Sequence, residues 1–263
     1  MLKKKETEMK IKNILTIIGL MSLIVSGIPN LGMATTITTT YLGGAYGYDS
    51  GSINPGPGGV LTNNVGFGGD SQMLATATAP VNFATVNSNF VSWCVDVYHW
   101  DSTNSTYTVG TAADLASSSN DGNPASAFGT NRVNALIKLA NEDYSLVKDK
   151  ITSAQFQLAV WAIMFGTPTN GIYQVNSSSF TATDPTDTAA ITNADTWLTN
   201  LNNNNYTGYY QLTYLSDDYL DGENTQDMVV FTPVPEPSTL FLLGVGIAGV
   251  AFYGKRRKNS KAI

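Results

Sequence analysis

Two side chains of this chain could react with each other: the thiol of Cys94 and the carboxamide of Gln157. Cys94 is the single cysteine among 263 residues. A thiol that attacks a carboxamide carbon and expels ammonia forms an acyl thioester, which is a stored electrophile. A primary amine can later displace the thiol and leave an isopeptide bond. This chemistry requires the two groups to be held as a near-attack pair and to be sheltered from water.

The residues around Gln157 predict a buried helix. Residues 154–165 read AQFQLAVWAIMF, and a helix that is apolar on every face is buried. Thr152 and Gln155 have the spacing of a capping box that would start the helix. The residues Gly166-Thr167-Pro168 would end it. An unpaired amide in such a helix costs on the order of 1–3 kcal/mol. We therefore expect either a hydrogen bond to backbone or the reaction described above.

The residues around Cys94 predict a sheltered β-strand, the second of two between residues 81 and 100. A strand places alternate side chains on opposite faces. One face would hold Phe90, Ser92, Cys94, Asp96 and Tyr98, and the other Val91, Trp93, Val95 and Val97. In such a strand Cys94 is either a small buried hydrophobe or the attacking thiol.

Two polar residues near Cys94 have alternative interpretations. Asp96 either polarises a nucleophile or accepts hydrogen bonds from the backbone. His99 follows Cys94 by five residues and would point to the opposite face of a strand. A cysteine protease needs a Cys–His pair within hydrogen-bond reach and a third orienting group, so this placement argues against one. His99 would then be a half-exposed residue at the end of the strand.

The elements that must position these residues predict an α+β fold. Alternating β-formers and Gly/Pro-rich turns indicate strands within residues 35–100, and residues 101–130 read as a polar loop. Helical periodicity follows, and two strands joined by a turn at Asp221-Gly222 close the domain. The predicted elements are a short strand at 106–109, helices near 131–140, 154–165 and 189–200, and strands at 209–215 and 227–232. We expect a β-rich sandwich or barrel with an inserted helical subdomain.

The first 34 residues have the features of a secretory signal peptide. Five lysines precede or enter an apolar run at residues 14–25, and Gly32-Met33-Ala34 supplies a small-x-small cleavage site. We predict cleavage after Ala34. A permanent signal anchor is the alternative, although the apolar run is shorter than the roughly 20 residues of a spanning helix.

The last 31 residues combine a short motif, an apolar run and a basic cluster. Pro235-Glu236-Pro237 precedes the apolar residues 239–253 and the KRRK at 255–258. A helix that ends in positive charge stops in a membrane with that end in the cytoplasm. This tail resembles the PEP-CTERM sorting signal. The resemblance implies transient membrane insertion of the helix, processing by an exosortase and transfer to the cell surface or extracellular matrix. An ordinary tail anchor is the alternative.

The segment from residue 85 to residue 165 resembles the bacterial surface thioester domains. Trp93-Cys94-Val95 is similar to their aromatic-or-Leu, Cys, apolar motif. The FQLAVW at 156–161 is similar to their second motif, in which x-Ala-aliphatic-Trp follows the glutamine; Phe156 stands where the family favours Thr. The resemblance implies a Cys94–Gln157 thioester and covalent adhesion to amines. The candidate shielding or supporting residues are Trp93, Asp96, Tyr98 and Trp161.

The composition between the two ends excludes several classes of function. Residues 35–233 hold four basic and 17 acidic residues, a net charge of −13. Such an acidic body repels nucleic acid and anionic membrane surfaces. One histidine and one cysteine cannot build a zinc site of the usual ligands, and no Asp-x-Asp-x-Asp calcium loop is present. We predict neither a metal nor a cofactor.

These patterns together predict a signal peptide at 1–34, a thioester-domain-like extracellular domain at 35–232 and a sorting segment at 233–263. The expected function is that of a surface or biofilm-matrix adhesin that couples covalently to an amine-bearing ligand, and not that of an enzyme. The alternative is a structural matrix or surface protein in which Cys94 is a plain thiol or forms a disulfide dimer. An extracellular hydrolase lacks a convincing acid/base pair.

Overall fold

The fold is given by a computed structural model of the chain. It describes residues 36–47, 50–54, 61–66, 70–75, 81–99, 104–119, 127–177, 179–183, 188–201, 209–217, 225–234 and 243–249. All of these residues belong to one compact unit, Ala34–Ile263. The predicted signal peptide, the Pro235-Glu236-Pro237 motif and the predicted turn at Asp221-Gly222 lie outside the described residues.

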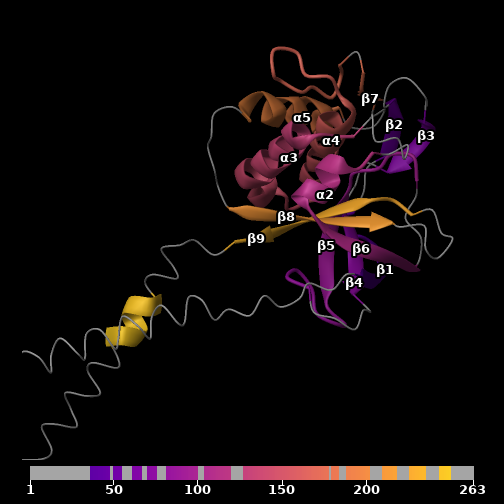
Figure 1. Cartoon of the computed structure of the whole chain (residues 1–263). Helices are drawn as coiled ribbons and strands as arrows, with labels where there is room; N and C mark the ends of the chain where they lie inside the picture. The colour runs from indigo at the N-terminus through magenta and orange to yellow at the C-terminus, as the bar shows by residue number, and fades with distance from the viewer. Residues whose placement is uncertain are drawn as a thin grey trace, which may run out of the picture. The chain divides into compact units, whose positions relative to one another are not determined.

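Within these residues, six antiparallel strands close into a barrel in the order β1-β4-β5-β9-β8-β6 (Figure 1). Closure pairs strand edges that would otherwise be open. The barrel confirms the predicted α+β class and its β-rich part. Its strands are β1 (Thr36–Gly44), β4 (Asp70–Ala75), β5 (Asn89–Cys94), β6 (Asn104–Thr111), β8 (Tyr210–Asp217) and β9 (Met228–Pro233).

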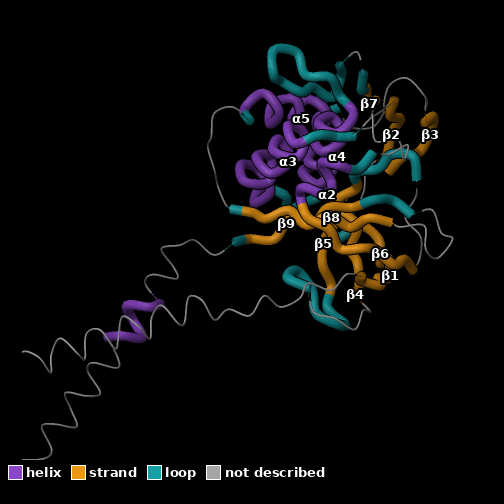
Figure 2. The backbone as a smooth tube through the Cα atoms, in the orientation of Figure 1, coloured by secondary structure: helices purple, strands orange, loops and turns teal. Residues whose placement is uncertain are grey.

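The helices form an insertion between β6 and β8, as the sequence predicts. They gather on one side of the barrel (Figure 2). There α4 packs against β5, α3 against β8, and α2 against both β6 and β8. The insertion comprises α2 (Ala112–Ser117), α3 (Thr130–Asp143), the 3-10 turn η2 (Tyr144–Leu146), α4 (Lys150–Phe165) and α5 (Ala189–Asn200).

A second sheet and a short helix were not expected from the sequence. The sheet has the order β3-β2-β7, with β2 (Ser50–Asn54), β3 (Leu61–Gly66) and β7 (Thr181–Thr183). Helix α2 occupies part of the predicted loop at 101–130. It begins with a capping box in which Thr111 and Asp114 cap each other's backbone, so a Thr-x-x-Asp signal was present in the sequence.

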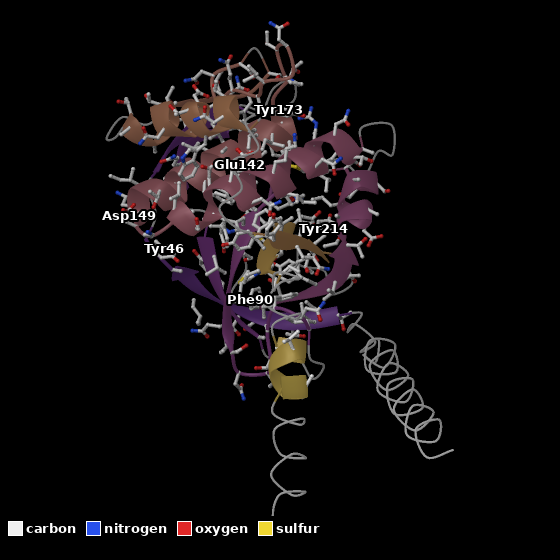
Figure 3. All side chains as sticks on the ribbon, turned by 90° about the vertical axis from the view of Figure 1, so that its left-hand side faces the viewer. Tyr46, Phe90, Glu142, Asp149, Tyr173 and Tyr214 are labelled. Carbon is white, nitrogen blue, oxygen red and sulfur yellow. The ribbon has the colours of Figure 1, made fainter. Side chains whose placement is uncertain are left out.

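Helix α4 starts four residues earlier than predicted. Its capping box pairs Asp149 with Thr152, so the predicted box of Thr152 and Gln155 is wrong. Asp149 is the N-cap because its carboxylate accepts a hydrogen bond from the Thr152 N–H at 2.9 Å. Gln155 then lies inside the helix, beyond its first turn. Every residue from 153 to 164 is buried, as expected of a helix that is apolar on all faces. Figure 3 shows Asp149 and Glu142 among the helices and Phe90 on the barrel.

Gly166 ends α4 because the backbone approaches it too closely for a side chain. A Cβ at this position would lie 2.3 Å from the carbonyl oxygen of Ala162. The Gly166 N–H donates to that same oxygen at 2.8 Å. The helix therefore ends at the Gly166-Thr167-Pro168 segment, as the sequence predicts.

Strand β5 is shorter than predicted, and the other strand expected between residues 81 and 100 is absent. Residues 81–88 form turns with one isolated bridge, Val81↔Ala84. Strand β5 ends at Cys94, so Asp96 and Tyr98 do not share a strand face with Cys94. The Asp96 carboxylate accepts from the Tyr98 N–H at 2.8 Å. This local bond favours a turn over a continuing strand.

Part of the predicted sorting helix is described. Residues 243–249 are helical, and they lie inside the apolar run at 239–253. Among the residues that the structure describes, no helix has both the length and the apolar character needed to cross a membrane.

Candidate functional site

Cys94 and Gln157 are neighbours in space although 63 residues separate them in the chain. The Cys94 N–H donates to Gln157 Oε1 at 3.0 Å, and Gln157 Nε2 donates to the Cys94 carbonyl oxygen at 2.8 Å. Gln157 is fully buried and Cys94 is 3 % exposed. The structure therefore places the carboxamide directly against the residue that carries the thiol, in a site closed to solvent.

The backbone of Cys94 is available to Gln157 because of the strand register. Strand β5 pairs with β9 at Trp93↔Val229 and Cys94↔Met228, and the Val95 N–H donates to Asp227 at 2.9 Å. Peptide groups alternate in direction along an antiparallel strand, so those of Cys94 point away from β9. On that other side, the described part of β4 begins at Asp70, opposite Trp93. The amide of Gln157 occupies the next pairing position.

The same geometry has chemical consequences for the carboxamide. Its oxygen already accepts a hydrogen bond from the Cys94 N–H, and this donor is placed to stabilise negative charge on that oxygen. The thiol of Cys94 donates to the backbone oxygen of Asp96. At the end of β5, the backbone of Cys94 thus holds the carboxamide, while the thiol of the same residue bonds to the backbone of Asp96.

Aromatic residues stand next to both members of the pair in the chain, Trp93 before Cys94 and Phe156 before Gln157. Trp93 is fully buried, and its ring lies 4.5 Å from that of Phe156 and 5.9 Å from that of Tyr144. Trp161, one turn after Gln157 on α4, is 2 % exposed. Tyr98 differs, because it is 38 % exposed. Trp93 and Trp161 are thus buried, as a shielding role would require, whereas Tyr98 lies at the surface.

Asp96 and His99 form a pair that the sequence analysis missed. The Oδ2 of Asp96 contacts the Nδ1 of His99, and the side chains are 5 % and 22 % exposed, respectively. His99 was expected to point away along a strand, but the turn after Cys94 folds it back onto Asp96. The other predicted role of Asp96, as an acceptor for backbone, is observed at Tyr98. An aspartate that starts a turn, followed three residues later by histidine, was the available signal.

A second acidic group lies beside Asp96. Asp227 precedes β9 and accepts hydrogen bonds from the Tyr214 hydroxyl and, at 2.8 Å, from the Asp217 N–H. The pKa of Asp227 is raised to about 6, mainly by burial and also by the negative charges of Asp96 and Asp217, while the hydrogen bonds from Tyr214 and Asp217 oppose this rise. Among the described residues, no three His, Cys, Asp or Glu side chains are grouped to hold a metal ion.

A cavity of about 370 Å³ opens beside the aromatic cluster of Trp93, Tyr144 and Phe156. Strands β5 and β9 pair only at Trp93↔Val229 and Cys94↔Met228. The earlier residues of β5 and the later residues of β9 are not paired with each other, and the cavity lies between them. Tyr144 and Phe231 line it and also contact the ring of Phe156, at 5.3 and 5.8 Å. Its lining residues are Asn82, Phe83, Asn89, Phe90, Val91, Tyr144, Tyr210, Val230, Phe231, Thr232 and Pro233.

Comparison with known proteins identifies the tail. Residues 233–258 match the model of the PEP-CTERM protein-sorting motif, which confirms the predicted motif at Pro235, Glu236 and Pro237. No curated protein and no solved structure matches the chain, so the thioester-domain resemblance of residues 85–165 gains no support from these comparisons. The chain is an exported protein of the kind that an exosortase sorts.

Proposed function

We propose that this exosortase-sorted protein is an adhesin of the cell surface or biofilm matrix. Cys94 and Gln157 form an internal thioester, which couples the protein covalently to amine groups on a ligand. Each molecule reacts once, so the protein is an acyl donor and not an enzyme. The observation that carries the proposal is the buried, two-point contact between the Gln157 carboxamide and the backbone of Cys94.

The bond changes balance without a cofactor. The Cys94 sulfur attacks the side-chain carbonyl carbon of Gln157, the C–N bond breaks, and the thiol proton leaves with ammonia. Later, a ligand amine attacks the same carbon, the C–S bond breaks, and a proton from nitrogen restores the thiol. In both steps the Cys94 N–H can stabilise the negative charge that develops on the acyl oxygen.

Burial supports the storage of such an electrophile. Gln157 has no exposed surface, and the rings of Trp93 and Phe156 pack 4.5 Å apart beside it. A thioester in this place would meet little water. The turn that carries the exposed Tyr98 follows Cys94 directly, so it is the part of the site that a ligand amine would reach first.

The alternative is a structural surface or matrix protein with a plain thiol. One observation favours it: both polar atoms of the Gln157 amide have a hydrogen-bond partner in the backbone of Cys94, which is sufficient reason for a buried glutamine. The disulfide-dimer form of this alternative is disfavoured, because a side chain that is 3 % exposed cannot meet a second molecule without local opening.

Intact mass spectrometry of the exported protein separates the two functions. The thioester predicts a mass lower by one ammonia than the sequence requires. It also predicts that methylamine adds covalently and exposes one thiol to alkylation. Cys94→Ala is the matched control, because both hydrogen bonds to Gln157 use the backbone and remain. A full-mass protein whose thiol is alkylated as soon as it is denatured, without amine treatment, would establish the plain thiol instead.

A further inference from the structure

The turn after β5 brings the thiol of Cys94, the carboxylate of Asp96 and the imidazole of His99 into one short segment. The Asp96 backbone oxygen accepts from the Cys94 thiol, while its side chain contacts Nδ1 of His99. We propose that Asp96 orients His99 as the proton acceptor for the amine that attacks the thioester. This inference rests on the proposed function, and it specifies the ligand group as a primary alkylammonium, such as a lysine side chain.

The contact with Asp96 fixes which nitrogen of His99 is basic. A carboxylate only accepts hydrogen bonds, so in the neutral imidazole the proton is on Nδ1 and the lone pair is on Nε2. Asp96 is 5 % exposed and His99 is 22 % exposed. The imidazole is thus partly exposed to solvent, and it is linked through Asp96 to the buried thiol of Cys94.

An alkylammonium must lose one proton before its nitrogen can attack. His99 Nε2 takes this proton, the nitrogen bonds to the Gln157 acyl carbon, and the C–S bond to Cys94 breaks. A second proton from the nitrogen passes to sulfur and restores the thiol, and His99 returns the first proton to solvent. Acid–base assistance of this kind typically contributes 10²–10⁴-fold in rate.

The backbone oxygen of Asp96 adds a contact for the amine. In the structure this oxygen accepts from the Cys94 thiol. A thioester sulfur carries no proton, so formation of the thioester removes that donor. The oxygen then remains as an acceptor beside the acyl group, placed for an N–H of the incoming amine.

Among the residues that the structure describes, an acidic group interacts with the carboxylate of this turn. Asp227, which leads into β9, has an electrostatic interaction with Asp96, and it is joined to Asp217 and Tyr214 by hydrogen bonds. On α4, the ring of Phe165 packs against that of Tyr98 at 6.2 Å. The carboxylates favour the approach of a cationic amine over that of an anionic ligand.

The test measures thioester opening in the exported protein with two nucleophiles across a range of pH. Methylamine is protonated at neutral pH and hydroxylamine is largely uncharged. The variants are His99→Gln and Asp96→Asn, the second of which keeps an oxygen for the Tyr98 N–H. Thr199→Ala, at an exposed position of α5 outside the site, is the control. Thioester content is read from the loss of ammonia in the intact mass.

We expect both variants to form the thioester and to react with methylamine at least 10-fold more slowly than the wild type at neutral pH. The deficit should shrink at high pH, and hydroxylamine should react at the wild-type rate. Wild-type rates with methylamine, or equal slowing with both nucleophiles, would overturn the role of His99 and leave the proposed function intact. A wild-type protein without a thioester would overturn both.

Discussion

Gln157 pairs with Cys94 as a strand residue would. Its side-chain amide donates to the Cys94 carbonyl and accepts from the Cys94 N–H, which are the two bonds of an antiparallel pair. The described part of β4 pairs with β5 as far as Asp70↔Trp93, and at Cys94 the partner of the backbone is a side chain of helix α4. The same two bonds hold the carboxamide against the residue that bears the thiol, so one arrangement serves both the fold and the proposed chemistry.

Gln157→Ala should therefore destabilise the domain even where no thioester can form. In a Cys94→Ala background, the substitution leaves a buried N–H and a buried carbonyl of residue 94 without partners. We expect the free energy of unfolding to fall by about 2–4 kcal/mol, as measured by urea denaturation.

The reference for that measurement is the single variant Cys94→Ala, which keeps both bonds to Gln157. Gln157→Glu in the same background should destabilise more than Gln157→Ala at neutral pH, because a buried carboxylate loses its hydration as well as the donor. Its loss should shrink at acidic pH, where the protonated carboxyl can donate again. If all three proteins unfolded at the same urea concentration, the two hydrogen bonds would contribute nothing to stability.

The sequence predicted the helix of Gln157 well, because its apolar run determines burial and Gly166 determines its end. It could not predict the start, since Asp149 and Thr152 both belong to plausible capping boxes and only the geometry chooses between them. A hydrogen bond from this amide to backbone was one of the two outcomes that the sequence predicted, and it is observed. The sequence could not predict that the backbone would be that of Cys94, because the two residues lie 63 positions apart and no local pattern specifies such a contact.

The strand of Cys94 was predicted over too long a range for a related reason. Val95 and Val97 continue the alternation that favours a strand, but Asp96 captures the Tyr98 N–H and turns the chain. The alternating pattern of residues 95–98 therefore does not continue the strand, because the hydrogen bond from the Tyr98 N–H to the Asp96 carboxylate stabilises a turn. The pair of Asp96 and His99 is a product of this turn, so the strand prediction concealed it.

Arg132 is expected to stabilise the end of α4. Its Nη1 donates to the carbonyl oxygens of Ile163 and, at 2.7 Å, of Gly166, and its guanidinium lies 5.8 Å from the ring centre of Tyr173. Arg132→Met should lower the free energy of unfolding by about 2–3 kcal/mol. Arg132→Lys should recover part of this loss, because the ammonium can still donate to a carbonyl oxygen. The recovery should be incomplete, because an ammonium lacks the planar fork of a guanidinium. Equal stability of the Met variant and the wild type would contradict the role.

Tyr214→Phe should have an effect that depends on pH. The Tyr214 hydroxyl donates to the Asp227 carboxylate, and such a bond favours the ionised form of the acid. Removing it should raise the pKa of Asp227 above its value of about 6. We expect a loss of about 1.5–3 kcal/mol at pH 8 and a smaller loss at pH 5, where Asp227 is largely protonated. A loss that is the same at both pH values would contradict the link.

Asp143 should make the domain less stable as the pH rises. The pKa of its carboxyl is raised from 3.8 to about 7, mainly by burial and also by the negative charge of Glu142. Its Oδ2 is buried without a hydrogen bond. A folded-state pKa above the unfolded value means that the folded state holds the proton more tightly. The associated stability is complete below pH 4 and is lost as the pH rises through 7.

Asp143→Asn removes this titration and keeps the shape of the side chain. We expect it to raise the free energy of unfolding at pH 8 by on the order of 1–3 kcal/mol and to change it little at pH 4. Urea denaturation at the two pH values measures the difference. Glu142→Gln is the matched control on the same helix, where the pKa is raised mainly by burial and lowered by Lys138. A smaller gain is expected from it, and an Asp143→Asn variant that gained no stability at pH 8 would show that the carboxyl ionises without cost.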